Sequence, residues 1–191
     1  MTPTDAPLSC FTVPAIEDLP DDIQKRLQEV EDKAGFVPNV MRVLTRRPAE
    51  FWAFMNYHDV LMDGPSTLTK AEREMIVVTT SGANQCLYCV VAHGAILRIR
   101  SKDPLLADQL ATNYRQAPLT PRQRAILDYA IKVSQQSYAV CEADREAAKQ
   151  AGLSDDEIWD IASIAAFFAM SNRLASASEM KPNREFYSMG R

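Results

Sequence analysis

Two cysteines and a histidine lie close together in one short segment. Cys86, Cys89 and His93 follow one another at intervals of three and four residues. In a helix, at about 100° per residue, these positions fall within about 60° of one another and share one face. The positive end of a helix favours a thiolate over a thiol, and the thiolate is the species that attacks a peroxide. A second thiol can then condense with the sulfenic acid to form a disulfide. The pattern predicts dithiol redox chemistry, with His93 accepting or relaying a proton.

A zinc-binding structural protein is the main alternative from another class. The two cysteines and His93 would supply three ligands of a tetrahedral zinc ion, and the fourth would have to come from elsewhere. Structural zinc sites usually have a second ligand pair, and none is visible in this sequence. A c-type haem site is excluded because Val90, rather than a histidine, follows Cys89. We therefore expect neither a cofactor nor a metal.

Glu74 lies upstream of the cysteines and has two interpretations. It follows a Thr-x-x-Glu capping box made by Thr69 and Glu72, which predicts the start of a helix. On an exposed face of that helix, Glu74 would only pair with Lys70, four residues earlier. Near the cysteines, the same carboxylate would take part in the chemistry. The residue types alone leave both interpretations open.

The combined pattern resembles a known family. The spacing Glu-x11-Cys-x2-Cys-x3-His is similar to that of the AhpD-like alkylhydroperoxidase and carboxymuconolactone decarboxylase superfamily, and more closely to its uncharacterised peroxidase-related branch. The likeness spans roughly residues 35–173. It rests on Arg73, Glu74, Asn84, Cys86, Tyr88, Cys89 and His93.

The resemblance implies a helical subunit that forms a homo-oligomer and reduces hydrogen peroxide or a small organic hydroperoxide. Carried over to this sequence, it makes Cys89 the attacking thiol, Cys86 the resolving thiol, and Glu74 with His93 a proton relay. The implied partners are the peroxide and an external thiol reductant of unspecified identity. A thiol-disulfide oxidoreductase or redox sensor with little peroxidase activity remains an alternative. Lactone decarboxylation, the superfamily's other activity, has no need of paired thiols.

Two further positions of the pattern are interpreted as supporting residues. Asn84 is in place, whereas Tyr88 stands where the best-known alkylhydroperoxidase pattern has a histidine. Tyr88 is therefore either a packing residue or a hydroxyl donor to the site. The helix dipole by itself favours Cys86 as the more acidic thiol, which disagrees with the order that the resemblance implies. We follow the resemblance and assign the attack to Cys89.

The remaining histidine and cysteines are interpreted without a chemical role. His58 falls in a polar stretch, Asn-Tyr-His-Asp, which is typical of an exposed helix face. Cys10 and Cys141 lack a second cysteine nearby, and we interpret both as ordinary small apolar residues.

The hydrophobic pattern predicts an all-α protein. Four prolines in residues 1–20 indicate an extended, irregular N-terminal arm. Residues 21–191 are expected to form a single helical domain, with the redox motif in 69–100. The β-branched run at 75–80 could pass for a buried strand, but we predict helix there. The expected helices cover 21–34, 48–62, 70–80, 85–100, 104–113, 121–136, 142–151 and 154–175, with a chain break at 82–84.

A short repeat suggests two related halves. The sequence Leu-Thr-Lys-Ala-Glu-Arg at 68–73 resembles Leu-Thr-Pro-Arg-Gln-Arg at 119–124. Both copies are also simply good helix starts, so duplication stays one of two interpretations. The second copy has Ala125 in place of Glu74 and lacks the cysteine pair. Any chemistry is therefore expected in the first half.

Composition excludes several classes of protein. The 191 residues are 47% hydrophobic and 24% charged, as in ordinary globular proteins. A net charge of −4 would repel a phosphate backbone, so we expect no nucleic-acid partner. No apolar run is long enough for a signal peptide or a membrane span, and we expect a cytoplasmic protein without a membrane partner. In a reducing compartment, four cysteines indicate chemistry or metal binding rather than structural disulfides.

Overall fold

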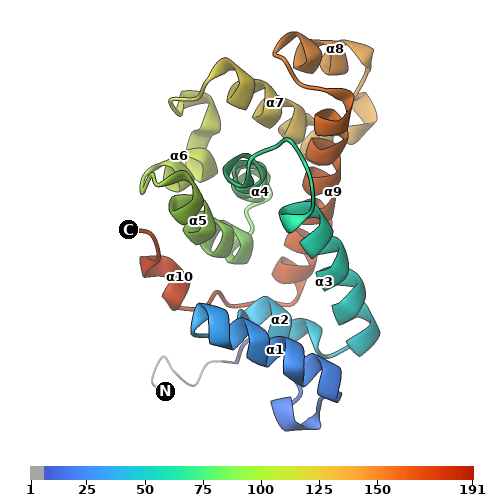
Figure 1. The fold of residues 1–191 in the computed structure, drawn as a ribbon, viewed down its shortest axis with the longest axis vertical. Helices are drawn as coiled ribbons and strands as arrows, with labels where there is room; N and C mark the ends of the chain where they lie inside the picture. The colour runs from blue at the N-terminus through green and yellow to red at the C-terminus, as the bar shows by residue number, and fades with distance from the viewer. Residues whose placement is uncertain (1–6) are drawn as a thin grey trace.

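The computed structural model describes residues 7–191, which form helices and contain no strand (Figure 1). The predicted all-α class is confirmed, and the predicted helices begin and end within three residues of their observed bounds. In chain order the elements are η1 (Ile16–Asp18), α1 (Asp21–Ala34), α2 (Asn39–Leu44), α3 (Pro48–Asp63), α4 (Lys70–Ala83), α5 (Leu87–Ser101), α6 (Leu106–Asn113), η2 (Tyr114–Gln116), α7 (Pro121–Gln136), η3 (Ser137–Ala139), α8 (Glu142–Gln150), α9 (Asp155–Ala177) and α10 (Glu185–Ser188).

Helix α4 runs through the middle of the fold. Figure 1 shows it end-on, with α3, α5, α6, α7 and α9 around it. Every residue from 72 to 81 is buried. The β-branched run at 75–80 is helical, as predicted, because packing on all sides rather than intrinsic propensity decides such a segment.

One arginine connects the starts of three helices. Helices α4, α7 and α9 each begin with a capping box, in which the third helical residue is Glu72, Gln123 and Glu157, respectively. Arg122 donates from Nε to Glu72 at 3.1 Å and from Nη2 to Glu157. Its guanidinium lowers the pKa of Glu157 to about 2. Two glutamates that cap helix backbones therefore also hold the three helix starts together.

The helix starts of α4 and α7 resemble each other in three dimensions. Arg73 donates hydrogen bonds to the carbonyls of Leu61, Gly64 and Leu68 in the segment before α4. Arg124 donates in the same way to carbonyls of the segment before α7, those of Tyr114 and Ala117. The short sequence repeat therefore corresponds to a repeated local structure, with an arginine that fixes the preceding loop.

A tight connection joins α4 to α5. Helix α4 continues to Ala83, which lies within the break predicted at 82–84, and Gln85 then adopts a left-handed conformation with φ of 54°. The backbone N–H of Cys86 donates to the Ser81 carbonyl at 3.0 Å, and that of Gln85 donates to Gly82 at 3.0 Å. This pair of bonds is the Schellman arrangement that ends many helices. It places Cys86 directly at the start of α5.

The N-terminal segment and two short helices complete the fold. Residues 7–20 are irregular apart from η1, and the Cys10 N–H donates to the Ser178 carbonyl at 2.9 Å. Residues 1–6 of the predicted arm lie outside the described part of the chain. Helices α2 and α10 were not predicted, because elements of six and four residues are too short for a recognisable periodicity.

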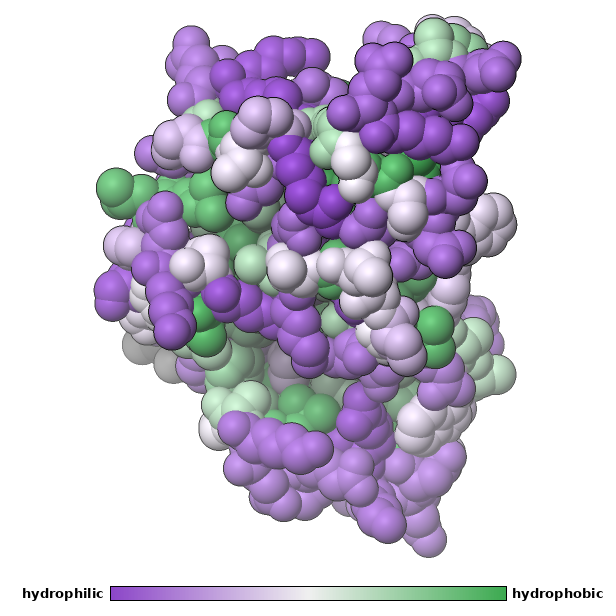
Figure 2. Space-filling view, turned by 45° about the horizontal axis from the view of Figure 1, so that its top comes forward, coloured by the Kyte–Doolittle hydropathy of each residue, from purple (hydrophilic) through white to green (hydrophobic). Residues whose placement is uncertain are grey.

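The surface combines polar residues with scattered large apolar side chains. Figure 2 shows a face that is mostly hydrophilic, with apolar residues between. Tyr138, Trp159 and Val60 are among the most exposed apolar side chains. Within residues 7–191, no helix has both the length and the apolar character needed to cross a membrane.

We expect Gln85→Gly to stabilise the protein. A left-handed backbone is unfavourable for a residue with a Cβ, so glycine should raise the free energy of unfolding by about 0.5–1 kcal/mol. Urea denaturation measures the change. The matched control, Gln150→Gly at the exposed last residue of α8, should lose up to about 1 kcal/mol, because glycine is a poor helix former. A loss of stability at both positions would contradict the role assigned to Gln85.

Candidate active site

A cavity of about 220 Å³ lies beside α5, and both Cys89 and His93 line it. Its other walls come from α1, α2, α3, α9 and α10. The apolar and aromatic part of the lining consists of Val30, Pro38, Val40, Met41, Phe54, Met55, Ala92, Ile96, Phe168 and Phe186. A larger surface cavity of about 670 Å³ between α7 and α8 has no cysteine or histidine in its lining. The smaller cavity is therefore the one with reactive side chains.

The two cysteines of the motif are buried and occupy the first turn of α5. Cys86 is the residue that precedes the helix, and Cys89 is its third residue. Their exposed fractions are 1% and 2%, and both thiols are free. Cys89 shares its cavity with His93, whereas Cys86 lines a second cavity of about 290 Å³ bounded by Ala175 to Lys181. The two cysteines therefore line different cavities.

The two thiols interact and titrate as a pair. The pKa of Cys86 is lowered to about 6, mainly by the hydrogen bond that the Cys89 thiol donates to it, and against the effect of burial. The pKa of Cys89 is raised, because its proton is held by the Cys86 sulfur and because the residue is buried. At neutral pH the pair therefore carries one negative charge, mostly on Cys86. This is the more acidic thiol that the helix dipole predicts.

Helix α9 supplies polar groups that sequence reasoning missed. The Ser171 hydroxyl lies 3.9 Å from the Cys89 sulfur. The Asn172 side chain lowers the pKa of both thiols by hydrogen bonding. These residues follow the apolar stretch 161–170, and that change to polar side chains is the only signal in the sequence. It was not sufficient, because nothing in the sequence connects α9 with the cysteine motif.

Glu74 is a buried carboxylate that connects a histidine of the cavity to an arginine. His93 Nδ1 lies 2.7 Å from one carboxylate oxygen of Glu74, and Arg100 donates to the other at 2.9 Å. The Glu74 side chain is 2% exposed, while Lys70 pairs with Asp63 at 2.8 Å. The interpretation of Glu74 as an exposed partner of Lys70 is therefore wrong. Glu74 instead orients the imidazole that lines the cavity.

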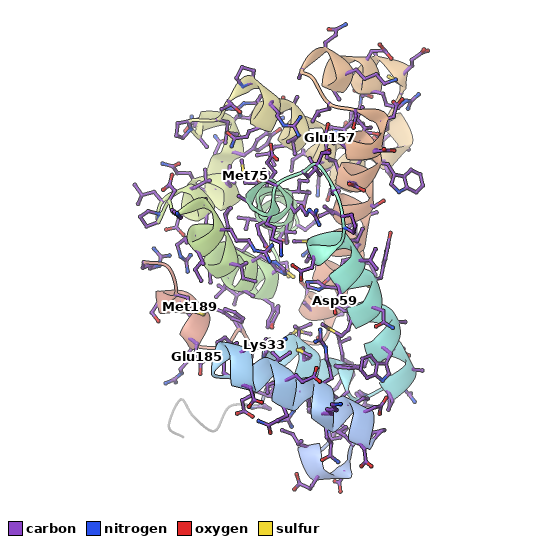
Figure 3. The ribbon with its side chains drawn as sticks, viewed as in Figure 1. Lys33, Asp59, Met75, Glu157, Glu185 and Met189 are labelled. Carbon is purple, nitrogen blue, oxygen red and sulfur yellow. The ribbon has the colours of Figure 1, made fainter. Side chains whose placement is uncertain are left out.

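His58 is a cavity residue rather than part of an exposed helix face, and this corrects the sequence interpretation. It comes from α3 and lines the same cavity as Cys89. Its Nδ1 lies 3.1 Å from the carboxylate of Asp59, which is labelled in Figure 3, and Arg26 donates to that carboxylate at 2.8 Å. The polar stretch around His58 was misleading, because successive helical residues point in different directions and only some face water.

The two supporting positions have structural contacts. The Tyr88 hydroxyl oxygen accepts a hydrogen bond from the Val40 N–H at 2.9 Å, which ties α5 to α2, and the ring lines the cavity. Burial raises the pKa of Tyr88, so it stays protonated at neutral pH. Asn84 lies at the end of α4 and donates to Asn172 at 2.8 Å. Asn84 therefore supports the residue that contacts the thiols and is not itself in the cavity lining.

The other cysteines lie apart from the site. Cys10 and Cys141 are both exposed, so neither is a buried packing residue. Within residues 7–191, no three His, Cys, Asp or Glu side chains are grouped so that they could hold a metal ion. The zinc alternative therefore has no donor set in the described part of the chain.

Comparison with known proteins identifies relatives with this fold. The sequence profile of the Carboxymuconolactone decarboxylase family matches residues 48–112, and a search of curated proteins found no match. One solved structure is described as an alkylhydroperoxidase AhpD core, an uncharacterized peroxidase-related protein from Ralstonia eutropha JMP134. It has 60% sequence identity and a TM-score of 0.96 over 97% of this chain and 98% of that one.

Two further structures are similar at lower identity. An uncharacterized peroxidase-related protein from Silicibacter sp. TM1040 has 44% identity and a TM-score of 0.94 over 97% of each chain. The debrominase Bmp8, solved with 2,3,4-tribromopyrrole, has 18% identity and a TM-score of 0.79 over 95% of this chain and 97% of that one. At that identity the likeness concerns the fold alone.

We expect the reduced protein to hold one thiolate at neutral pH. In a background with Cys10 and Cys141 replaced by serine, the ultraviolet thiolate absorbance should rise with a midpoint near pH 6. Cys89→Ala removes the donor that stabilises the Cys86 thiolate, and should therefore move the midpoint upward, toward the ordinary value of about 8.5. A midpoint near the ordinary value in both proteins would contradict the shared proton.

Proposed function

The chain belongs to the AhpD-like carboxymuconolactone decarboxylase family, and we propose that it is a thiol-dependent peroxidase that reduces hydrogen peroxide or a small organic hydroperoxide. The observation that carries this proposal is the position of Cys89. Cys89 lines a small cavity together with His93, and its thiol interacts with a second thiol that can resolve an oxidised product. The peroxidase-related names of the two closely similar structures support the same activity.

The proposed reaction begins when the proton shared by the two sulfurs passes to Cys86. The Cys89 thiolate attacks the distal oxygen of the hydroperoxide, the O–O bond breaks, and Cys89 becomes a sulfenic acid. The released alkoxide or hydroxide takes up a proton. The Cys86 thiol then attacks the Cys89 sulfur, so that a disulfide forms and water leaves. Two electrons from an external thiol reductant reopen the disulfide.

Cys89 is proposed as the attacking thiol even though Cys86 is the more acidic. A peroxide in the cavity meets the Cys89 sulfur, whereas Cys86 lines the second cavity, away from both imidazoles. One proton is shared within the pair, so the form with the thiolate on Cys89 is a minor state in exchange with the major one. We therefore assign the attack to the cysteine that shares a cavity with the peroxide and the imidazoles, and not to the cysteine that carries most of the charge in the resting protein.

The cavity supports a small substrate. Its volume of about 220 Å³ is below the roughly 300–1,000 Å³ of pockets for drug-sized ligands. Its apolar and aromatic walls suit the alkyl group of a small hydroperoxide, and its imidazoles suit the peroxide oxygens. A protein limited to thiol-disulfide exchange or redox sensing is the remaining alternative, and repeated turnover with peroxide distinguishes it from a peroxidase.

We further propose that the chain acts in the cytoplasm, as a homo-oligomer, with a thiol reductant as its second partner. Exposed apolar side chains such as Trp159 and Val60 offer contact area for a second copy. Cys86, on the second cavity, is the sulfur that a reductant would reach from a side different from that of the peroxide. Light scattering of the purified chain reports its subunit number.

Peroxide consumption with a dithiol reductant should collapse in Cys89→Ser, because serine cannot form the sulfenic acid. A loss of at least about 10³-fold is expected for removal of a nucleophile that forms a covalent intermediate. The control is Cys141→Ser at an exposed cysteine, which should retain full activity. Activity that survives in Cys89→Ser would refute the assignment.

In Cys86→Ser, the oxidised intermediate should accumulate because the resolving thiol is missing. Mass spectrometry after peroxide treatment is expected to find sulfenic or sulfinic acid on Cys89. Two results together would establish the reverse order of attack. Cys89 would stay unoxidised in Cys86→Ser, and Cys86 would become a sulfenic acid in Cys89→Ser.

A further inference from the structure

The cavity beside Cys89 contains a second imidazole, which the reaction described above does not use. His58 comes from α3, whereas Cys89 and His93 come from α5. Figure 1 shows these two helices as separate elements of the fold. The ring centroids of His58 and His93 are 6.3 Å apart. Helices α3 and α5 therefore each contribute one imidazole to the cavity that Cys89 also lines.

The surroundings of His58 repeat the arrangement around His93. His58 Nδ1 lies 3.1 Å from one oxygen of Asp59, and Arg26 donates to the other oxygen at 2.8 Å. Each imidazole thus has a carboxylate on Nδ1 and an arginine behind that carboxylate. A carboxylate on Nδ1 fixes the orientation of the ring and leaves Nε2 as the nitrogen available to a substrate. A histidine held only for packing would not need this set of contacts.

We infer that His58 is the acid that protonates the leaving oxygen when Cys89 attacks a hydroperoxide, an inference that rests on the proposed peroxidase function. A thiolate attacks the distal oxygen in line with the O–O bond, so the leaving oxygen lies on the far side from the sulfur. His93 follows Cys89 by one helical turn and lies on the same wall of the cavity, which α5 forms. His58 belongs to a different wall of the cavity and is the imidazole placed for the departing oxygen.

The other titratable side chains of the cavity are less suited to this step. The Arg26 guanidinium is engaged in a hydrogen bond to the Asp59 carboxylate. Asp59 is already held between Arg26 and His58, and burial raises the pKa of Tyr88, which makes its hydroxyl a poorer acid. His93 is adjacent to the thiol and is engaged by Glu74. His58 remains as the group that can release a proton to an alkoxide and recover it.

The protons and electrons of the step balance. The Cys89 thiolate gives two electrons to the distal oxygen and becomes Cys–S–OH, while the O–O bond breaks and alkoxide leaves. His58 in its imidazolium form, with a proton on each ring nitrogen, passes the Nε2 proton to the alkoxide, and an alcohol departs. His58 then recovers, through solvent, the proton that the thiol pair released on ionisation. Its side chain is 25% exposed, which allows this exchange. The net change is thiol plus hydroperoxide to sulfenic acid plus alcohol.

The test compares two oxidants with different leaving groups in a single turnover. Reduced wild type and His58→Gln are mixed with tert-butyl hydroperoxide, whose alkoxide needs a proton, or with peracetic acid, whose carboxylate does not. Rapid quenching and mass spectrometry measure the rate of disulfide formation, with Cys89→Ser as the background. We expect His58→Gln to lose about 10²-fold with the hydroperoxide and less than about threefold with the peracid.

A matched control and three outcomes complete the test. Asn56→Ala changes an exposed residue of the same helix and should react like wild type with both oxidants. Equal losses with both oxidants in His58→Gln, or no loss with the hydroperoxide, would overturn the role of His58 and leave the peroxidase proposal intact. Wild-type protein that reacts with neither oxidant would instead overturn the proposed function. Thermal unfolding of each variant verifies that the fold is retained.

Discussion

The carboxylate of Glu74 is almost completely removed from water and lies on the helix at the centre of the fold. A buried charge that loses its partners destabilises a protein by roughly 3–5 kcal/mol, so the contacts around this carboxylate are a requirement of the fold. Both partners, His93 and Arg100, come from α5 and lie two turns apart, one on each oxygen. They fix the rotation and register of α5 against α4. Since Cys86 and Cys89 begin α5, the same constraint sets the position of the two sulfurs.

The connection before α5 acts together with this constraint. Gln85 adopts a left-handed conformation so that α4 can end and α5 can begin almost at once, with the Cys86 N–H bonded to the Ser81 carbonyl. The segment from Cys86 to His93 is thereby held at both ends. Long-range contacts supply the rest of the environment, because Ser171 and Asn172 reach the thiols from α9 and His58 enters the cavity from α3. The residues on α4 and α5 therefore acquire their complete surroundings only when α3 and α9 pack against them.

Cys86 and Cys89 line two different cavities. Cys89 shares its cavity with both imidazoles and with apolar side chains, while Cys86 shares its cavity with the end of α9 and the residues that follow it. In the peroxidase reaction that we propose, a peroxide and a reducing thiol approach the two cysteines from different sides. The two thiols interact, and this interaction lowers the pKa of Cys86 and raises that of Cys89.

The sequence by itself determined the helical class, most helix bounds and the placement of Cys86 and Cys89 at the start of one helix, because these depend on periodicity, capping residues and spacing within one helix. It also identified Glu74 through its distance from the cysteines, although residue types alone could not separate an exposed partner of Lys70 from a buried one. Only the tertiary structure decided that Glu74 is buried between His93 and Arg100, that His58 shares the cavity, and that α9 contacts the thiols. These facts depend on which helix faces pack together. Local sequence patterns do not predict such contacts, because the contacts join segments that are far apart along the chain.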